Sequence, residues 1–399
     1  MQNIDRSKKK LINNILATGM YQILIMIVPI ITTPFVTRIF SPAQIGEYGL
    51  SLAIANLFVI LANAGMPFYG SREIAQSQDS YELYSRFNNL WSAQIINTVF
   101  WTLFYSLYVY YFSDMNPISV CQILLVLVST LDISWFYIGI EGIKNNIYRN
   151  LISKIFVTAT IFVVVKNEDD LILYTLLNVL GMLLGNLSMF VGLGKLVKIK
   201  ICIPNNLAHL IRKSYHLMYT QLIASIQGPA ERGILNYFSK TTLNVGIYDQ
   251  GIKIINLMFS VLNSAINAMM PRMAFEMSEG NLETVKRYSH KVMDLGFAFS
   301  ILAISGIFNA SDSFVIFFFG SGYEEVATVM KITSISLLFT PLSSFLSSGI
   351  LIPQKKDNIV LLSAILITGT TIALNVLLDF KYTIYGISIS YVASSVLGF

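Results

Sequence analysis

Long apolar segments, separated by short polar ones, run along almost the whole chain. Stretches such as 52–67 and 254–270 contain no Asp, Glu, Lys or Arg. A helix needs about 20 mostly apolar residues to cross the hydrocarbon core of a bilayer. The pattern therefore predicts about twelve membrane-spanning helices, at 11–38, 46–68, 87–111, 117–140, 148–165, 171–194, 209–237, 243–270, 291–309, 326–352, 358–378 and 382–399.

The composition extends this interpretation to the whole chain. Hydrophobic residues make up 54% of the sequence and charged residues 12%, which is about half the charged share of an ordinary soluble domain. Mean hydropathy is +0.63 over all 399 residues, so the excess does not come from one anchor on a soluble body. The longest predicted loop on the side opposite the N-terminus is 310–325, and no segment outside the membrane is long enough to bury a domain core, which excludes a soluble catalytic domain.

The distribution of Lys and Arg predicts the orientation. The N-terminus carries Arg6 and Lys8–Lys10 ahead of an apolar stretch too long for a signal peptide, so we expect a retained first span. Of the 27 Lys and Arg, 20 fall on the side shared with the N-terminus and four on the other, Arg38, Lys166, Lys240 and Lys381. Cytoplasmic loops are enriched in these residues, so the N-terminus is predicted to be cytoplasmic. This bias also accounts for the net charge of +5, so the charge does not indicate that the protein binds nucleic acid.

The two halves of the chain share a hairpin. Between spans 1 and 2 the chain reads Phe40-Ser41 and then Gly46-Glu47-Tyr48; between spans 7 and 8 it reads Phe238-Ser239 and then Gly246-Ile247-Tyr248. An even number of intervening spans makes such a repeat parallel. We therefore predict an all-α polytopic membrane protein with two parallel six-helix repeats around a central cavity. The lobes would be 1–200 and 201–399.

Several motifs resemble one family of transporters. They are Ile27-Val28-Pro29, Thr33-Pro34-Phe35, Thr37-Arg38, Gly46-Glu47-Tyr48, the stretch from Asp132 to Glu141 followed by Arg149-Asn150, Lys166 to Leu171, and Tyr248 with Lys253. Together they are similar to Wzx-type polysaccharide repeat-unit flippases of the multidrug/oligosaccharidyl-lipid/polysaccharide exporter superfamily, which has a MATE-like fold. The resemblance covers essentially the whole chain. One departure is that the chain stops at Phe399 inside the predicted twelfth span, so a truncated last span is expected.

The resemblance implies the substrate, the compartment and the partners. It implies transfer of an undecaprenyl-pyrophosphate-linked oligosaccharide across the bacterial cytoplasmic membrane for O-antigen or capsule synthesis. The other implied partners are membrane lipids, a polysaccharide polymerase and a chain-length regulator. No cofactor and no nucleic acid are implied.

Four basic residues in or beside the predicted spans are the candidates for substrate binding: Arg38, Arg232, Lys253 and Lys331. Ionisable groups inside a bilayer are costly and usually face a protein or water interior. Guanidinium and ammonium groups suit a lipid pyrophosphate. Structural alternatives stay open, namely an i,i+4 pair of Lys253 with Asp249, pairing of Arg232 across helices, and snorkelling of Arg38 to the interface.

Acidic and helix-breaking residues supply further candidates. Asp132 in span 4 and Asp249 in span 8 are predicted to couple protonation to transport, with structural hydrogen bonding as the alternative. Pro29 and Pro34 in span 1, and Gly228-Pro229 in span 7, interrupt helices at corresponding places and are candidate hinges. Acids such as Asp379 are assigned to the loops of the outer face.

The sequence does not contain the motifs that would indicate a catalytic site. It contains no HExxH, Walker or Gly-rich phosphate-loop motif, and its two cysteines and three histidines predict no metal site. We therefore expect a transporter that is not an enzyme. The alternatives are a drug or small-cation exporter of the same superfamily, which needs a smaller and more acidic cavity, and a membrane-embedded polysaccharide polymerase, which needs a sizeable catalytic loop.

Overall fold

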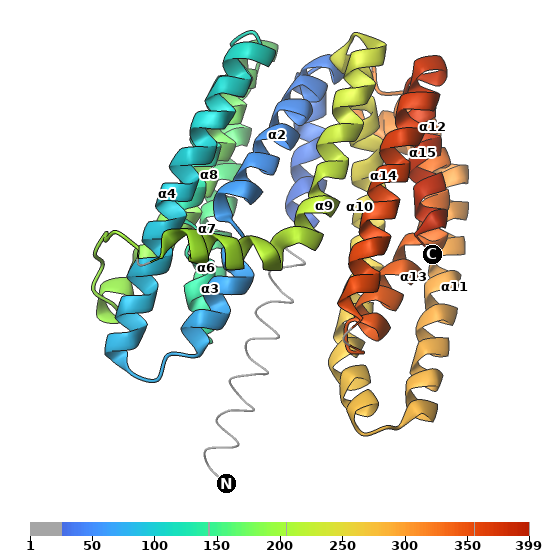
Figure 1. Ribbon diagram of the computed structural model, residues 1–399. Helices are drawn as coiled ribbons and strands as arrows, with labels where there is room; N and C mark the ends of the chain where they lie inside the picture. Colours follow the sequence, from blue (N-terminus) through green and yellow to red (C-terminus); the bar gives the residue numbers. More distant parts are fainter. Residues whose placement is uncertain (1–25, 143, 205, 355, 399) are drawn as a thin grey trace. The chain divides into compact units, whose positions relative to one another are not determined.

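The computed structural model describes residues 26–142, 144–204, 206–354 and 356–398. Within these ranges it is helical and has no strand, as the sequence predicts (Figure 1). The first part of the predicted first span, 11–25, lies outside the described residues. The helices are Met26–Ile39, α2 (Pro42–Asn63), α3 (Met66–Ala75), α4 (Ser80–Phe112), α5 (Pro117–Val128), α6 (Ser134–Gly139), α7 (Lys144–Val164), α8 (Leu171–Phe190), α9 (Leu207–Ser239), α10 (Thr242–Ser278), α11 (Leu282–Phe319), α12 (Glu325–Ser334), α13 (Thr340–Phe345), α14 (Asp357–Tyr382) and α15 (Ile384–Leu397).

Among the residues that the structure describes, eight helical segments are long and apolar enough to cross a membrane. They are 42–75, 80–112, 117–139, 147–164, 168–195, 283–319, 325–351 and 358–382, and they match eight of the predicted spans. Two further segments, Met26–Ile39 and Ile384–Leu397, are apolar but shorter. The remaining predicted spans, 7 and 8, coincide with α9 and α10, which carry most of the charged groups that the sequence placed inside the membrane.

The helices begin where the sequence supplies caps. The Asp79 side chain accepts a hydrogen bond from the Glu82 amide at 2.7 Å and starts α4. The Asn116 side chain accepts from the Ile118 amide at 2.9 Å, with Pro117 in the first turn of α5. Thr241 caps α10 in the same way. Such caps satisfy amides that have no partner inside the helix, and they fix the hairpins between successive spans.

One predicted loop is shorter than expected. The sequence analysis left 310–325 outside the membrane, whereas α11 stays helical to Phe319, leaving only a short connection to α12. Apolar residues such as Phe314 and Val315 continue the helical pattern past the polar Asp312, which explains the extension. The predicted tenth span is present but irregular, since it passes from α12 through a 3₁₀ turn and α13 into a π-helical turn, Leu346–Leu351.

The chain forms two compact units. Unit 1 contains Met1–Ile39 and Ser51–Leu222, and unit 2 contains Phe40–Leu50 and Ile223–Phe399. Two helices, α2 and α9, therefore contribute residues to both. The predicted lobes 1–200 and 201–399 stay a prediction.

Unit 1 is built around packed aromatic side chains. Phe87 stacks on Trp91 and Trp135, with ring centroids 6.0 Å and 5.7 Å apart. The Trp135 indole donates to the buried Gln94 side chain at 2.9 Å, so its polar atom is satisfied in the core. Around this core α7 packs along α8, and α5 packs against α4 and α8.

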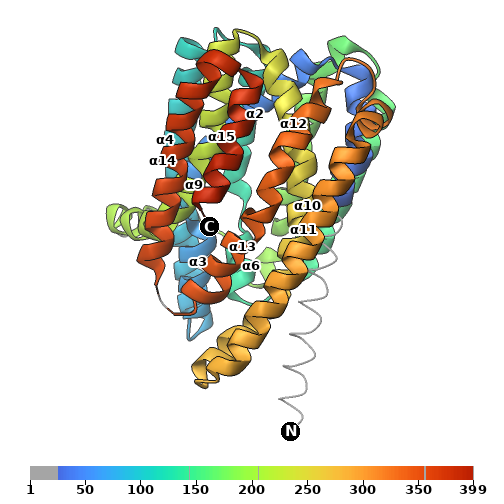
Figure 2. The ribbon, with the colours of Figure 1, turned by 90° about the vertical axis from the view of Figure 1, so that its right-hand side faces the viewer.

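In unit 2 the two repeated hairpins cross at glycines. A Cβ atom added at Gly46 would lie 1.8 Å from the Thr242 carbonyl oxygen, and one added at Gly246 would lie 1.9 Å from the Pro42 carbonyl oxygen. Only glycine permits such an approach of two backbones. The Thr242 hydroxyl donates to the Ala43 carbonyl at 2.9 Å and holds the crossing. Elsewhere in unit 2, α14 packs along α15, and α10 against α11 and α12 (Figure 2).

Candidate functional site

A cluster of charged and polar side chains occupies the interior of unit 2, where α9 and α10 meet. Arg232 Nε lies 2.8 Å from Asp249 Oδ1, and an Arg232 Nη1 donates to the Gly228 carbonyl at 3.0 Å. The second oxygen of Asp249 lies against Gly49 of α2, so a Cβ at position 49 would come within 2.2 Å of it. The backbone of α2 therefore covers the ion pair, and it can come this close because Gly49 has no side chain.

Glu231 is the next member of this cluster and is buried with only 5% of its surface exposed. The Gln227 side-chain amide donates to its Oε1 at 2.8 Å, and the Tyr248 hydroxyl donates to its Oε2 at 3.2 Å. Glu231 is therefore held by neutral donors, while its neighbour Arg232 turns to Asp249. A buried carboxylate whose hydrogen bonds come from neutral groups is suited to protonation changes.

α14 contributes two more buried polar residues. Asn375 and Asp379 are 0% exposed and lie one helical turn apart. Neither their two amide atoms nor their two carboxylate oxygens has a hydrogen-bond partner in the described part of the chain. Glu231 lies close enough for its charge to act on Asp379 and on Tyr391 of α15. We call Glu231, Asp249, Asn375 and Asp379 the acidic cluster.

The placement of Asp379 corrects the sequence analysis, which assigned this residue to an outer loop. α14 remains helical to Tyr382, and the first turn of α15 packs against Leu378 and Asp379 at Gly386. Sequence reasoning named Asp249 as a coupling residue but missed the contribution of α14, because Asp379 stands at the polar end of an apolar run, where a loop acid is common. The one available signal was the i,i+4 spacing of Asn375 and Asp379 inside the helical pattern.

The four predicted substrate-binding cations each have a local partner. An Arg38 Nη1 donates to the Pro34 carbonyl at 2.9 Å, in unit 1. In unit 2, Lys253 Nζ lies 3.3 Å from Gln250 Oε1, and Lys331 Nζ lies 2.7 Å from Asp312 Oδ2. Together with the Arg232–Asp249 pair these contacts give each cation its own neighbour, and a common basic surface stays a prediction. The expectation that Arg232 pairs across helices is confirmed.

Asp132, the other predicted coupling residue, lies at a break between helices. α5 ends at Val128 and α6 begins at Ser134, with Asp132 in an extended conformation between them. Its Oδ1 accepts from the Ser134 amide at 3.0 Å, and its carbonyl accepts from Gln94 at 3.1 Å. These contacts give it a structural role at the break, and coupling through Asp132 stays a prediction.

The predicted hinge residues lie inside continuous helices. Pro29 and Pro34 belong to the helix Met26–Ile39, and Gly228 and Pro229 to α9. In both places an arginine four residues further along donates to a backbone carbonyl: Arg38 to Pro34, and Arg232 to Gly228. Movement at these positions stays a prediction.

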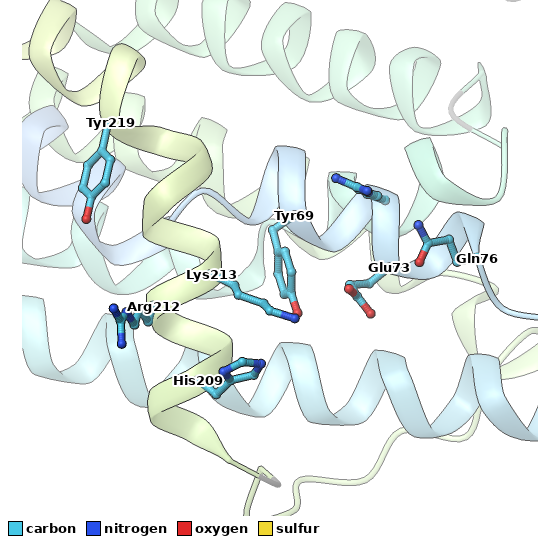
Figure 3. Close-up of a pocket in the computed structure, with 8 residues that line it drawn as sticks. Tyr69, Glu73, Gln76, His209, Arg212, Lys213 and Tyr219 are labelled. Atoms are coloured by element: carbon cyan, nitrogen blue, oxygen red, sulfur yellow. The ribbon is translucent and has the colours of Figure 1, made fainter. Parts of the chain in front are cut away.

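A second candidate site lies entirely within unit 1, between α3 and the first turns of α9. It is a cavity of about 660 Å³ into which polar side chains project (Figure 3). Its lining residues are Tyr69, Arg72, Glu73, Gln76, His209, Arg212, Lys213 and Tyr219. The sequence analysis counted these cations only as loop charges that set orientation. The missed signal is that polar residues on two separate segments recur at helical spacing.

Comparisons with known proteins agree with this architecture. Residues 11–277 match the family model described as "Polysaccharide biosynthesis protein". The chain is 21% identical over 341 residues to an Escherichia coli (strain K12) protein named "Putative O-antigen transporter", a match that covers 83% of this chain and 81% of that protein.

Solved structures show the same fold. A multidrug-resistance MATE family transporter of the MOP superfamily aligns with a TM-score of 0.72 at 14% identity, covering 97% of this chain and 96% of its own. The lipid II flippase MurJ aligns with a TM-score of 0.74, also at 14% identity, covering 97% of this chain and 86% of its own. The predicted all-α, MATE-like fold class is confirmed.

Proposed function

The chain belongs to the polysaccharide biosynthesis protein family, and we infer from this that it is a flippase for lipid-linked oligosaccharides. It would move undecaprenyl-pyrophosphate-linked repeat units across the bacterial cytoplasmic membrane for surface polysaccharide synthesis. Its N-terminus would be cytoplasmic and it would perform no chemical step. The polymerase and the chain-length regulator of the same route would take up its product.

One observation in the structure carries the proposal of a transport cycle, namely the acidic cluster inside helices that belong to a membrane fold. Buried polar atoms without partners cost free energy, and ionisable residues within membrane helices usually mark a substrate or ion pathway. A purely structural scaffold would gain stability by replacing Asn375 and Asp379 with apolar residues. Their presence supports a role for these side chains in function.

We propose that Asp379 and Glu231, together with Asp249, bind and release a proton or a monovalent cation during transport. Two ionised carboxylates that are buried near each other repel, so the binding of a proton or a cation to one of them lowers the free energy. Because α9, α10 and α14 all contribute to the cluster, occupancy would change how these three helices pack. That change would link the ion to the conformational cycle.

The drug-exporter alternative has one observation in its favour, which is the likeness to a MATE family transporter. At 14% identity this likeness concerns the fold alone. The family match and the E. coli relative favour an oligosaccharide carrier.

The test is reconstitution of the purified protein into vesicles that carry a lipid-linked oligosaccharide. We expect oligosaccharide to become accessible to a lectin on the opposite leaflet at a rate well above that of protein-free vesicles. A protein that leaves the oligosaccharide in place but exports a cationic dye would overturn the proposal in favour of the drug exporter. In cells that lack their own flippase, the gene should restore surface polysaccharide at normal protein amount.

A further inference from the structure

The cavity in unit 1 between α3 and α9 (the α3–α9 cavity) carries a surplus of positive charge. Arg72, Arg212 and Lys213 line it and have no ion-pair partner among the residues that the structure describes. The one acid in the lining, Glu73, is already paired: Arg86, which does not line the cavity, places Nη1 3.3 Å from Glu73 Oε2. Three cations therefore face a space in which the only carboxylate is compensated from outside.

The helical register turns these groups toward one space. On α3, Tyr69, Arg72 and Glu73 follow the spacing i, i+3, i+4, which places them on one face, and Gln76, the capping residue after the helix, continues it at i+7. On α9, His209, Arg212 and Lys213 occupy i, i+3 and i+4 of the facing helix. Figure 3 shows His209 and Lys213 projecting from α9 toward Tyr69 of α3. The facing surfaces of α3 and α9 are thus polar, whereas two helices packed in a protein core would face each other with apolar side chains.

The opposite face of α9 is fixed within unit 1, so the part of the helix that carries Arg212 and Lys213 is held in place. The Ser214 hydroxyl donates to the Ala64 carbonyl, and the Tyr215 hydroxyl donates to the Leu61 carbonyl at 2.9 Å. The Trp101 indole donates to the Tyr215 hydroxyl at 2.6 Å. Gly65, with φ at +68°, permits this close packing, because a Cβ there would lie 2.5 Å from the Ser214 carbonyl oxygen. Binding a ligand would therefore require little ordering of the helix.

The chemistry of the lining fits a phosphate-bearing head group with attached sugar. Two guanidinium forks and an ammonium match the oxygens of a diphosphate. Tyr69, Gln76 and His209 add neutral hydrogen-bonding groups next to them. A volume of about 660 Å³ lies within the range of small-molecule sites and is larger than a bare phosphate needs. Arg72 lies in the last turn of α3, beyond an apolar helical run, so the cavity is at one end of a predicted span.

We propose that the α3–α9 cavity binds the sugar diphosphate head of the polyprenyl carrier at the cytoplasmic surface, before translocation. This inference rests on the proposed flippase function and on the predicted orientation. It places the first contact with substrate inside unit 1 alone, apart from the four cations Arg38, Arg232, Lys253 and Lys331. The shared ligand chemistry is that of a diphosphate, and its source would be a membrane lipid.

Binding is measured with the full-length protein in nanodiscs of phosphatidylcholine, using polyprenyl diphosphate as the probe. The test variant is the triple substitution Arg72→Gln, Arg212→Gln, Lys213→Gln. Each charge-assisted contact to phosphate is worth roughly ten- to a hundred-fold in affinity, so the triple variant should bind at least about a hundred-fold more weakly. The matched control is Lys195→Gln with Lys198→Gln, which removes exposed charges in the same unit but outside the cavity, and should bind normally.

Two competing ligands distinguish the sources of phosphate. Inorganic pyrophosphate should displace the lipid probe, weakly, since it shares only the head group, and complete failure to compete counts against the cavity as a diphosphate site. Phosphatidylglycerol, with one phosphate, should compete far less well than polyprenyl diphosphate. Equal competition would overturn the proposal in favour of a general anionic-lipid site. Equal probe affinity for the triple variant and the control would also overturn it.

Failure of this inference and failure of the proposed function give different results. If the wild-type protein translocates oligosaccharide and the triple variant does so equally well with normal probe affinity, the cavity has no role and the flippase function stands. If the wild-type protein binds the diphosphate in a cavity-dependent way but moves no oligosaccharide, the proposed function fails. The thermal midpoint of the triple variant, compared with that of the Lys195→Gln, Lys198→Gln control, shows whether any loss of affinity comes from misfolding.

Discussion

At the scale of single residues, two charged neighbours in the sequence of unit 2 bind different partners. Glu231 and Arg232 are adjacent, yet the first accepts from Gln227 and Tyr248 while the second pairs with Asp249. Consecutive helical residues point about 100° apart, so they reach different helices. This separation leaves Glu231 without a strong cationic partner and leaves Asp249 with one.

The Arg232–Asp249 pair predicts a double-mutant result. Arg232→Gln should destabilise the protein by on the order of 2–3 kcal/mol, because Asp249 would keep an uncompensated, largely buried charge. The double variant Arg232→Gln with Asp249→Asn should recover most of this loss, measured as the thermal midpoint in detergent. The control is Lys331→Gln, which should cost less because its partner Asp312 has a side chain that is 70% exposed. Equal losses in the single and double variants would show that the two charges are not coupled.

Asp379 predicts a separation of stability from transport. Asp379→Asn removes a buried charge without changing the size of the side chain, so the thermal midpoint should stay the same or rise. Transport should nevertheless be lost if the carboxyl group takes up a proton or cation in the cycle. The matched control is Asp312→Asn, whose side chain is 70% exposed and pairs with Lys331. Normal transport by Asp379→Asn would remove this residue from the coupling role.

At the scale of helices, the glycine crossing of α2 and α10 is the most demanding contact in unit 2. Backbone atoms of the two helices occupy the positions where side chains would begin at Gly46 and Gly246. Both glycines come from the hairpin that recurs in the two halves of the sequence. The repeated motif is therefore used for contact between its own two copies.

Substitution at this crossing should be costly. Gly46→Ala or Gly246→Ala would force the helices apart, and overpacking of this kind costs about 1–3 kcal/mol or more. We expect a lower thermal midpoint and reduced transport in both variants. Gly306→Ala in α11 is the control, since a Cβ there meets nothing within 4 Å. If Gly46→Ala had the same thermal midpoint as Gly306→Ala, the close approach of α2 and α10 would be contradicted.

At the scale of the whole chain, the proposed orientation rests on the distribution of Lys and Arg. Reporters fused after Arg86, Arg149 or Lys198 should be cytoplasmic, and those after Asp114 or Asp170 should face the other side. The measurement is the activity of a reporter that works on one side only, paired with one that works on the other. An inverted pattern would move the α3–α9 cavity to the outer face and make it a site for product release.

The hydropathy pattern determined the fold class and the places of the spans, and the residues from Ile27 to Lys253 carried the resemblance to a family. These properties follow from local composition, because membrane insertion depends on each segment of about 20 residues largely by itself. The repeated Gly46 and Gly246 motifs also marked two equivalent hairpins. Their contact with each other was not predicted.

Only the tertiary structure decided which charge meets which. Asp379 has the sequence context of a loop acid and becomes buried because α15 folds back onto the end of α14. Arg72 and Lys213 lie far apart along the chain, and they line one cavity because Ser214 and Tyr215 fix α9 to unit 1. The partner of an ionisable group depends on how helices distant in sequence pack, which a pattern along one chain does not contain.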